Sequence, residues 1–309
     1  MSKYLNSKIL KRIEEKKRLL DKNRPLPKSA LEKLREQIIV EWTYNSNAIE
    51  GNTLTLRETK LILEQGITVA NKSLREHFEA TNHRDAILFL EKLVKKRGVE
   101  ENDILKIHQI ILKNIEKEYA GKYREGALRI LGALKLPPNY LKVPKLMKEL
   151  CREINKNPEK LSIIELASLA HYRFVAIHPF YDGNGRTARL LMNLILMQKD
   201  YPPVVVLRND RKRYYNALRK ADKGDYKPFI LLMAISIERA LDLYLRAIKG
   251  GAREKLERLS KLAKKTVYSQ EYLSLLARQG KLAAVKEGRR WYSSLKAIRD
   301  YKEKRERKR

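Results

Sequence analysis

The sequence predicts a mainly α-helical protein with two short pairs of β-strands. Apolar residues recur at helical spacing over most of the 309 residues, and two stretches, 163–177 and 190–197, are apolar on nearly every face. Such stretches are typical of helices buried in a core. Short alternating segments with glycines occur at 123–138 and 284–292. We therefore expect one β-hairpin in the main part of the chain and another near the C-terminus.

The chain is long enough for one large core and a small second domain. A Pro25-Leu-Pro27 break precedes a helix expected from about Ser29. We expect an N-terminal helical region over residues 1–60, a main core over 61–250 and a separate module over 262–309. Gly250 and Gly251 lie where a linker would join the last two.

Composition limits the classes of protein that the chain can belong to. A single cysteine, Cys151, excludes an intramolecular disulfide and predicts a buried thiol in a reducing compartment. We find no signal-peptide pattern and no run of about 18 apolar residues, so we expect a cytoplasmic protein without membrane contact. The net charge of +31 favours polyanionic partners such as nucleic acid, acidic proteins or nucleotides, although a surface rich in ion pairs would explain much of it.

The polar residues between the two apolar stretches predict a phosphate site. Gly183 and Gly185 permit positive φ, so successive N–H groups can turn inward at the start of the next helix. Arg186 and Arg189 are three residues apart and share one face of that helix. Asp182 is a hard oxygen ligand suited to Mg²⁺ bound to phosphates.

His178 supplies an imidazole that accepts a proton near neutral pH. Together these residues predict a site for nucleotide-phosphate transfer with one general base. The pattern is neither a Walker A loop nor a dinucleotide fingerprint, because it lacks the Gly-Lys-Ser/Thr of the first and the preceding strand of the second.

Residues 178–189, HPFYDGNGRTAR, resemble the signature of the Fic family, HxFx[D/E]GNGRxxR, at every specified position. The resemblance implies an all-α fold that binds Mg-ATP and transfers AMP to a hydroxyl side chain of a target protein. It implies that His178 deprotonates this hydroxyl, that Phe180 anchors the loop in the core and that Asp182 holds Mg²⁺.

The same resemblance assigns the ATP phosphates to the start of the second helix. The backbone of Gly183 and Gly185, with Asn184, would cradle the phosphates. Arg186 would bind the β- and γ-phosphates, and Arg189 would complete the γ-phosphate site.

A carboxylate is expected at the end of an earlier helix. Ser46 and Glu50 are four residues apart on one helix face, and Gly51 is a natural helix-ending residue. Ser46 to Gly51 is similar to the inhibitory motif [S/T]xxxE[G/N] of Fic proteins. The resemblance implies that Glu50 pairs with Arg189 and occupies the place of the γ-phosphate, so that the enzyme rests inactive.

Two further parts of a substrate site are expected. The 126–138 hairpin would offer a free edge on which an extended segment of the target protein docks, with a plain connecting hairpin as the alternative. Tyr214, Tyr215 or Asn216 would contact the adenine ring. The remaining histidines lack the spacing of a zinc site, so we expect no zinc.

The C-terminal residues resemble the winged helix-turn-helix of excisionase and MerR-like proteins. Ser269 is expected to cap a helix that Gly280 ends, and Ser293 or Ser294 to cap the last helix. The module would contact DNA through a basic wing and tail, dock proteins or only cap the fold. The wing residues are Lys286, Arg289 and Arg290, and the tail is 302–309.

The sequence thus favours a protein adenylyltransferase that uses Mg²⁺ and ATP and is inhibited by Glu50. One alternative is a de-AMPylase in which Glu50 orients water at the same site. Another is a DNA-binding regulator whose Fic core senses nucleotides. A homodimer is left open.

Overall fold

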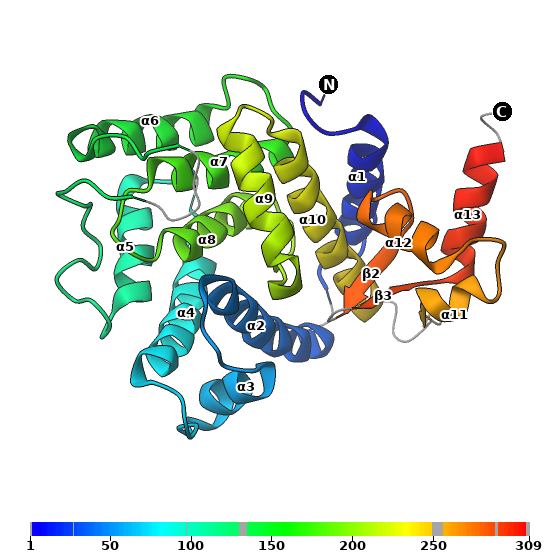
Figure 1. Cartoon of the computed structure of the whole chain (residues 1–309), viewed down its shortest axis with the longest axis horizontal. Coiled ribbons are helices and arrows are strands. Elements are labelled where there is room, and N and C mark those ends of the chain that lie inside the picture. The colour runs from blue at the N-terminus through cyan, green and yellow to red at the C-terminus, as the bar shows by residue number, and fades with distance from the viewer. Residues whose placement is uncertain are drawn as a thin grey trace. The chain divides into compact units, whose positions relative to one another are not determined.

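The computed structural model describes residues 2–26, 28–96, 98–129, 135–248, 256–287 and 290–306. The chain divides into two compact units, Met1–Leu241 and Asp242–Arg309. Helices make up most of the described residues, and these residues contain one three-stranded sheet (Figure 1). The predicted mainly α-helical fold is therefore confirmed. None of the helices in the described ranges is long and apolar enough to cross a membrane.

The first unit is a helical assembly. Its elements are α1 (Ser7–Asp21), α2 (Lys28–Glu50), α3 (Leu56–Gln65), α4 (Leu74–Leu93), α5 (Glu101–Leu112), η1 (Tyr140–Lys142), α6 (Val143–Lys156), α7 (Ile163–Ile177), α8 (Asn184–Met197), η2 (Arg208–Asp210), α9 (Arg211–Asp222) and α10 (Lys227–Ile248), the last of which continues into the second unit.

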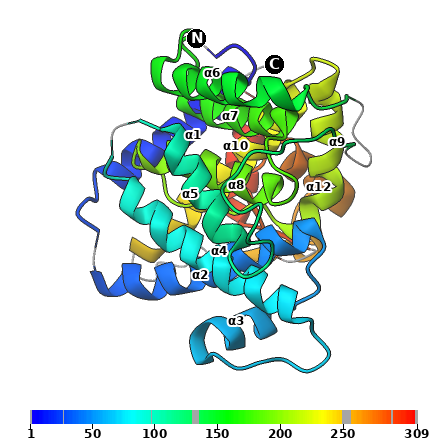
Figure 2. The ribbon, with the colours of Figure 1, turned by 90° about the vertical axis from the view of Figure 1, so that its left-hand side faces the viewer.

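Helix α8 is the centre of this unit. It packs against α7, α5, α4 and α2, and every residue from Arg186 to Leu196 is buried. Figures 1 and 2 show α8 surrounded by these helices, with α6 beyond α7 and α3 at the far edge of α2 and α4. Burial of its leucines, each contributing about 1.5–3 kcal/mol, holds α8 firmly in place. Groups at its N-terminal end are therefore presented by a rigid element.

The turn between α7 and α8 is sharp because two of its residues are left-handed. Ser162 and Glu165 form a capping box at the start of α7, and His178 ends that helix with φ 50°. Gly183, with φ 75°, precedes the first residue of α8. Glycine adopts this conformation without the steric cost that a side chain brings. The two helices are thus joined by the six residues 178–183, and the polar loop lies at the N-terminal end of α8.

The end of α2 lies where the sequence placed it. Glu50 is the last residue of α2, and Gly51 follows with φ 111°. Gly66 ends α3 in a left-handed conformation, and Thr55 caps its start. Cys151 is buried with a free thiol, as expected.

The second unit combines a small sheet with three helices beyond the end of α10. Its elements are β1 (Glu257–Arg258), α11 (Leu259–Ala263), α12 (Gln270–Arg278), β2 (Ala284–Glu287), β3 (Arg290–Ser293) and α13 (Leu295–Glu306). The antiparallel sheet has the order β1-β3-β2. A buried apolar cluster of leucines, Ala277 and Ile298 fills the unit.

The predicted C-terminal hairpin is confirmed, since Val285 of β2 pairs with Tyr292 of β3. Ser269 caps α12, and Ser294 accepts a hydrogen bond from the N–H of Ala297 in the first turn of α13. Strand β1 precedes residue 262, at which the sequence predicted the module to begin. The turn residues 288–289, which include Arg289 of the predicted wing, lie outside the described residues.

The predicted 123–138 hairpin is not seen in the part of it that is described. Residues 123–129 and 135–138 contain no strand, and residues 130–134, with Gly132, lie outside the described residues. Arg124 explains the irregular backbone, because its side chain donates to the carbonyl oxygens of His178 and Gly126. The predicted linker at Gly250 and Gly251 and the last residues of the tail also lie outside the described ranges.

Asn193 generates a stability prediction. Its amide oxygen accepts from the N–H of Val204 at 2.6 Å, and its amide nitrogen donates to the carbonyl oxygens of Val204 and Arg189. Asn193→Ala leaves the buried Val204 groups unpaired and should lower the free energy of unfolding by roughly 3 kcal/mol, measured by urea denaturation. Asn216→Ala, at an exposed position of α9, is the matched control and should change it by less than about 0.5 kcal/mol. Equal changes in the free energy of unfolding for the two variants would contradict a stabilising role of the Asn193 hydrogen bonds.

Candidate active site

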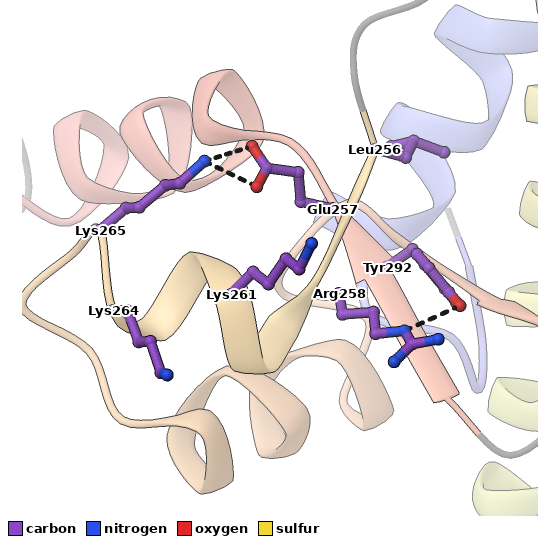
Figure 3. A pocket seen from close by; sticks show the side chains of 7 residues that line it. All are labelled: Leu256, Glu257, Arg258, Lys261, Lys264, Lys265 and Tyr292. Atoms are coloured by element: carbon purple, nitrogen blue, oxygen red, sulfur yellow. Dashed lines mark hydrogen bonds and ion pairs between the residues drawn. The ribbon is translucent and has the colours of Figure 1, made fainter.

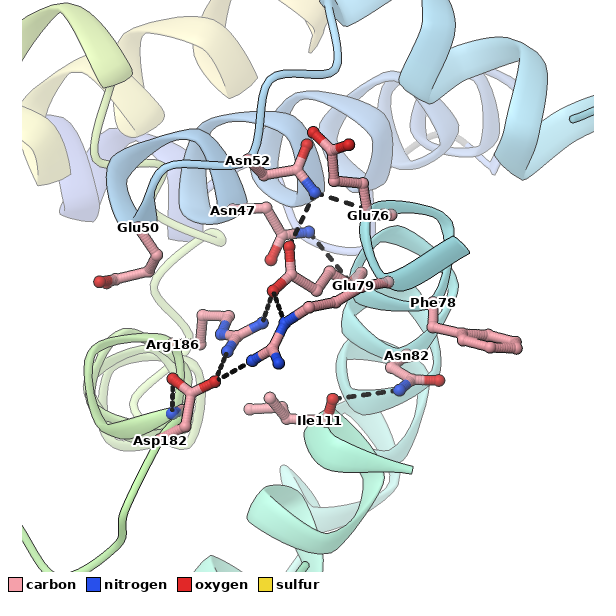
Figure 4. Close-up of polar contacts among 12 residues, drawn as sticks. Asn47, Glu50, Asn52, Glu76, Phe78, Glu79, Asn82, Ile111, Asp182 and Arg186 are labelled. Carbon is pink, nitrogen blue, oxygen red and sulfur yellow. Dashed lines mark hydrogen bonds and ion pairs between the residues drawn. The ribbon is translucent and has the colours of Figure 1, made fainter. Parts of the chain in front are cut away.

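Polar side chains from α2, α4 and the α7–α8 turn meet at the N-terminal end of α8. Glu50 projects from the end of α2, and Asp182 and Arg186 lie below it (Figure 4). Glu79 of α4 lies beside Arg186 in the same view. The structure therefore brings together the two motifs that the sequence singled out, although more than 120 residues separate them.

Arg189 is held by the end of α2. Its Nη2 lies 2.8 Å from Oε1 of Glu50 and donates to the carbonyl oxygen of Ser46 at 2.8 Å. Its Nε donates to the hydroxyl of Ser46 at 3.0 Å. The guanidinium is buried, which would lower the pKa of Arg189, but the carboxylate of Glu50 together with Tyr214 and Tyr215 outweighs burial and raises it. The predicted contact between Glu50 and Arg189 is therefore present.

The carboxylate of Glu50 lies directly against the first turn of α8. A Cβ added at Gly185 would collide with Oε1 of Glu50 and come within 3.2 Å of Nη1 of Arg189. The hydroxyl of Tyr215 lies 3.4 Å from Oε2. The first N–H groups of a helix have no partner within it and attract anions. Glu50 thus occupies the anion-binding end of α8.

Tyr214 and His171 lie on the other side of Arg189. Nη1 of Arg189 donates to the Tyr214 hydroxyl at 3.5 Å, and this hydroxyl lies 3.1 Å from Nε2 of His171. Burial lowers the pKa of His171 to about 3, so the ring is neutral, and its Nε2 can accept a hydrogen bond from the hydroxyl that accepts from Arg189. Tyr214 is buried between His171 and Phe229. Tyr214 therefore orients Arg189, and its ring has no exposed face on which an adenine ring could stack.

Asp182 and Arg186 belong to a second network. Oδ2 of Asp182 lies 2.7 Å from Nη2 of Arg75 and 3.2 Å from Nη2 of Arg186. Nη1 of Arg186 lies 3.2 Å from Oε1 of Glu79, whose other oxygen accepts from Asn52 at 2.9 Å. Figure 4 shows Arg186 lying between the two carboxylates. Nε of Arg186 is buried without an acceptor among the described residues.

Asp182 is chemically suited to a divalent cation. Burial would raise its pKa, but Arg186, the N–H of Gly183 and Arg75 outweigh burial and lower it, so the carboxylate is charged at neutral pH. Mg²⁺ is commonly bound by one or two carboxylates together with substrate phosphates and water. Asp182 beside an anion site fits this mode. Arg75 currently lies against the oxygen that an ion would use.

His178 lies at the turn with its backbone fixed. Its carbonyl oxygen accepts from Nε of Arg124 at 2.9 Å, and the N–H of Arg124 donates to the carbonyl oxygen of Pro179 at 2.9 Å. Burial lowers the pKa of His178 to about 4, although the nearby carboxylates of Glu50 and Asp182 act to raise it. The imidazole is thus neutral at pH 7 and can accept a proton.

The loop is anchored by Phe180 and Asn184. Phe180 is fully buried and stacks on His108 with ring centres 3.5 Å apart. Asn184 accepts from the N–H of Phe180 and donates to its carbonyl oxygen, so its side chain shapes the loop. His108 accepts from the N–H of Gly121 at Nδ1 and therefore donates from Nε2 to the carbonyl oxygen of Asp182.

Comparison with known proteins decides the family of this chain. The sequence model of the Fic/DOC family matches residues 98–196, which include the α7–α8 turn. A Fic domain-containing signaling protein from Bacteroides thetaiotaomicron superposes with a TM-score of 0.73 at 31% identity, covering 78% of this chain and 99% of that protein. This chain belongs to the Fic/DOC family.

Other Fic relatives match a similar part of the chain. Fic-1 from C. elegans superposes with a TM-score of 0.70 at 35% identity, over 79% of this chain and 74% of that structure. The "Protein adenylyltransferase Fic" of Nematostella vectensis is 39% identical over 248 residues, which are 79% of this chain and 57% of that protein. The chain spans about half the length of the curated relatives it matches.

The family signature identified most of the side chains in this Fic site, but four neighbours were missed. Arg75 and Glu79 on α4, Arg124 and His108 contact Asp182, Arg186 or the backbone of the turn. Arg75 and Glu79 share one helix face with ordinary surface residues. Only the position of Arg124 just before a glycine-containing irregular segment could have drawn attention to it.

The three predicted adenine contacts lie on α9 of the Fic unit in different surroundings. Tyr215 is half-buried beside Glu50, and burial raises its pKa to about 12. Asn216 is exposed and accepts a hydrogen bond from Arg219. Tyr214 is fully buried. Tyr215 is therefore the member of this set that is both partly exposed and in contact with Glu50.

The low pKa of His178 gives a testable prediction. Its imidazole should titrate near pH 4, which imidazole ¹⁵N NMR would measure, with His178→Gln identifying the signal. Because the unfolded value is about 6.5, the unfolded state binds more protons between these values. His178 should therefore reduce stability as the pH falls from 6.5 to 4. Titration near 6.5 would contradict the burial described here.

Proposed function

We propose that this Fic protein transfers AMP from ATP to a hydroxyl side chain of a target protein and that Glu50 inhibits the reaction. The observation that carries the proposal is the Glu50–Arg189 pair at the N-terminal end of α8. A carboxylate placed on the anion site of a nucleotide-transfer enzyme acts as a brake. Relatives named protein adenylyltransferases support the chemistry.

Several groups support binding of a triphosphate at this site. The first N–H groups of α8 and the dipole of that helix favour negative charge. Arg186 and Arg189 are both buried, and Nε of Arg186 has no acceptor in the described part of the chain. Planar guanidinium groups bind phosphate oxygens in pairs. Arg186 therefore keeps an N–H donor that no acceptor in the described part of the chain satisfies and that a phosphate oxygen could satisfy.

In the proposed reaction the target hydroxyl oxygen attacks the α-phosphorus of ATP. A new phosphorus–oxygen bond forms, and the bond from the α-phosphorus to the bridging oxygen of the β-phosphate breaks, so pyrophosphate leaves. His178 takes the hydroxyl proton because its ring is neutral at pH 7. Asp182 would hold Mg²⁺, which neutralises phosphate charge when bound.

Inhibition follows from competition for one guanidinium. Glu50 accepts from Arg189, and a γ-phosphate would need the same N–H groups. Two anions in one place repel each other strongly in a poorly solvated site. ATP would therefore bind with its γ-phosphate displaced, which removes the α-phosphorus from alignment with the target hydroxyl.

The target protein is proposed to dock on residues 126–138. Arg124 connects the start of this segment to the α7–α8 turn, because its side chain donates to the carbonyl oxygens of Gly126 and His178. Leu136 is 74% exposed and offers an apolar contact. A target segment bound here would lie beside the turn that carries His178.

Hydrolysis of AMP from a modified target is the second candidate. Glu50 is 31% exposed at its side chain and its charge acts on His178, which supports a role for this carboxylate in orienting water near the same phosphorus. Removal of AMP would then require Glu50, whereas transfer of AMP would be inhibited by it. Assays of both directions on one target separate the two functions.

The second unit is proposed to be a winged helix-turn-helix-like module. Helices α11 and α12 are consecutive and pack together, and β2 and β3 form the hairpin that follows them. This element order and the pairing of β1 with β3 support the proposal.

Replacing Glu50 tests the brake. Glu50→Gly should increase AMP incorporation from labelled ATP into the protein itself, because Arg189 becomes available to the γ-phosphate. Adding His178→Ala should then lower incorporation by about 10²–10⁴-fold. Glu64→Gly, at the end of α3 and paired with Lys60, is the matched control and should have no effect. Equal incorporation by wild type and Glu50→Gly would count against the proposal.

Replacing Arg75 tests the metal site. Arg75→Gln removes a cation 2.7 Å from Asp182 and should strengthen binding of Mn²⁺, a probe for Mg²⁺, in the Glu50→Gly protein with ATP. Electron paramagnetic resonance of free Mn²⁺ measures this binding. Arg84→Gln, on the same helix and paired with Asp85, is the control and should bind as before. Unchanged affinity in both proteins would remove Asp182 from the metal site.

A further inference from the structure

The second unit contains a cavity of ≈ 730 Å³ with a basic lining (Figure 3). Four of its lining residues are cationic: Arg258, Lys261, Lys264 and Lys265. Glu257 is the one acidic residue among those that line it. The cavity therefore has a large excess of positive charge, and neither the transfer reaction nor its inhibition uses it.

The single carboxylate does not neutralise this excess. Glu257 is paired with Lys265, whose Nζ lies 2.6 and 2.7 Å from its two oxygens. Nε of Arg258 donates to the Tyr292 hydroxyl at 3.4 Å, a neutral partner. Lys261 and Lys264 form no ion pair with any residue in the described ranges. Three cations thus remain available to an external anion.

The cations are carried by a well-packed element. Lys261 is in α11, and Lys264 and Lys265 follow at its end, three and four residues after Lys261. Leu259 and Leu262 of α11 are buried in the core of the unit. Arg258 belongs to β1, opposite Tyr292 of β3. The basic groups are therefore presented from a fixed base, although the lysine side chains themselves are exposed.

The charge of the whole segment favours a polymeric anion. Residues 242–309 contain 21 Lys and Arg against 8 Asp and Glu, a net charge of +13. A small phosphate compound would need only the cavity, whereas a polyanion also gains from charge spread over the segment. In helix-turn-helix proteins the first helix of the pair crosses the phosphate backbone of DNA. Here the first helix is α11, which carries the lysines.

We propose that this cavity binds the phosphate backbone of duplex DNA. Lysine ammonium groups act as point charges on phosphates and carry little sequence information. Helix α12 exposes Gln270 and Arg278 as well as Glu271 and Leu275, and Arg278 donates to the carbonyl oxygen of Ser274 in its own helix. Binding through the cations of the cavity is therefore expected to be independent of sequence and sensitive to salt. The site lies at β1 and α11, whereas the sequence suggested the wing and the basic tail as the surfaces for DNA contact. Lys286 of the wing lies over the ring of Trp291.

The test compares two triple variants of the full chain. Arg258→Gln/Lys261→Gln/Lys264→Gln removes the available cations of the cavity. Lys281→Gln/Lys296→Gln/Arg299→Gln removes the same charge from exposed positions elsewhere in the unit. Fluorescence anisotropy with a labelled 30-base-pair duplex at several salt concentrations gives affinity and its salt dependence. Circular dichroism melting checks that each variant is folded.

The cavity variant should bind DNA more weakly than the wild type for every sequence. The slope of log affinity against log salt concentration should become shallower by about 1 for each lost phosphate contact, about 3 in all. The control variant should lose less affinity for DNA, and its salt dependence should change less. Equal losses in the two folded variants would show an effect of net charge without a site and overturn the proposal.

Competition distinguishes the source of the anion. Unlabelled duplex DNA should displace the probe, whereas inorganic phosphate and ATP at the same phosphate concentration should not. Displacement by polyglutamate at lower concentration than by DNA would show an acidic protein to be the partner and overturn the proposal. Displacement of the probe by ATP at a lower concentration than by DNA would show a nucleotide site and would also overturn the proposal. AMP transfer in the Glu50→Gly background provides an independent measure of the integrity of the first unit.

Discussion

The guanidinium of Arg189 is the group on which the organisation of the site depends. It is buried at the N-terminal end of α8, where helix dipole and side chain both favour an anion. A buried cation without an anion is costly, so the protein must provide one or bind one. Glu50 meets that need within the chain. Any ligand anion that uses Arg189 must replace an interaction that already satisfies it.

The rest of the fold confines the competition between Glu50 and a ligand anion to the surroundings of Arg189. Helix α8 is buried on all sides, and Tyr214 and His171 fix the far side of Arg189. Glu50, by contrast, is the last residue of α2 and is followed by Gly51 in a left-handed conformation. Arg189 is thus held by a rigid core. Glu50 lies at the end of a helix, where the backbone can change its conformation with less loss of packing.

Contacts between neighbours in sequence were predictable, whereas of the contacts across the fold only the one between Glu50 and Arg189 was predicted, through the family resemblance. The turn between His178 and Gly183 and the end of α2 at Glu50 follow from glycines and local spacing. Arg75 and Glu79 come from a helix about 100 residues before the turn, and nothing in their own segment marks them. Alternation in 123–138 predicted a hairpin, but the described residues of this segment contain no strand, and the side chain of Arg124 donates to the carbonyl oxygens of Gly126 and His178.

The central claim is that Glu50 and the γ-phosphate of ATP compete for Arg189, and nucleotide affinities test it most directly. Isothermal titration should compare ATP with ADP, which lacks the γ-phosphate, for wild type and Glu50→Gln. Competition predicts that Glu50→Gln strengthens binding of ATP and leaves binding of ADP nearly unchanged. Equal changes for both nucleotides, or none for either, would contradict the account.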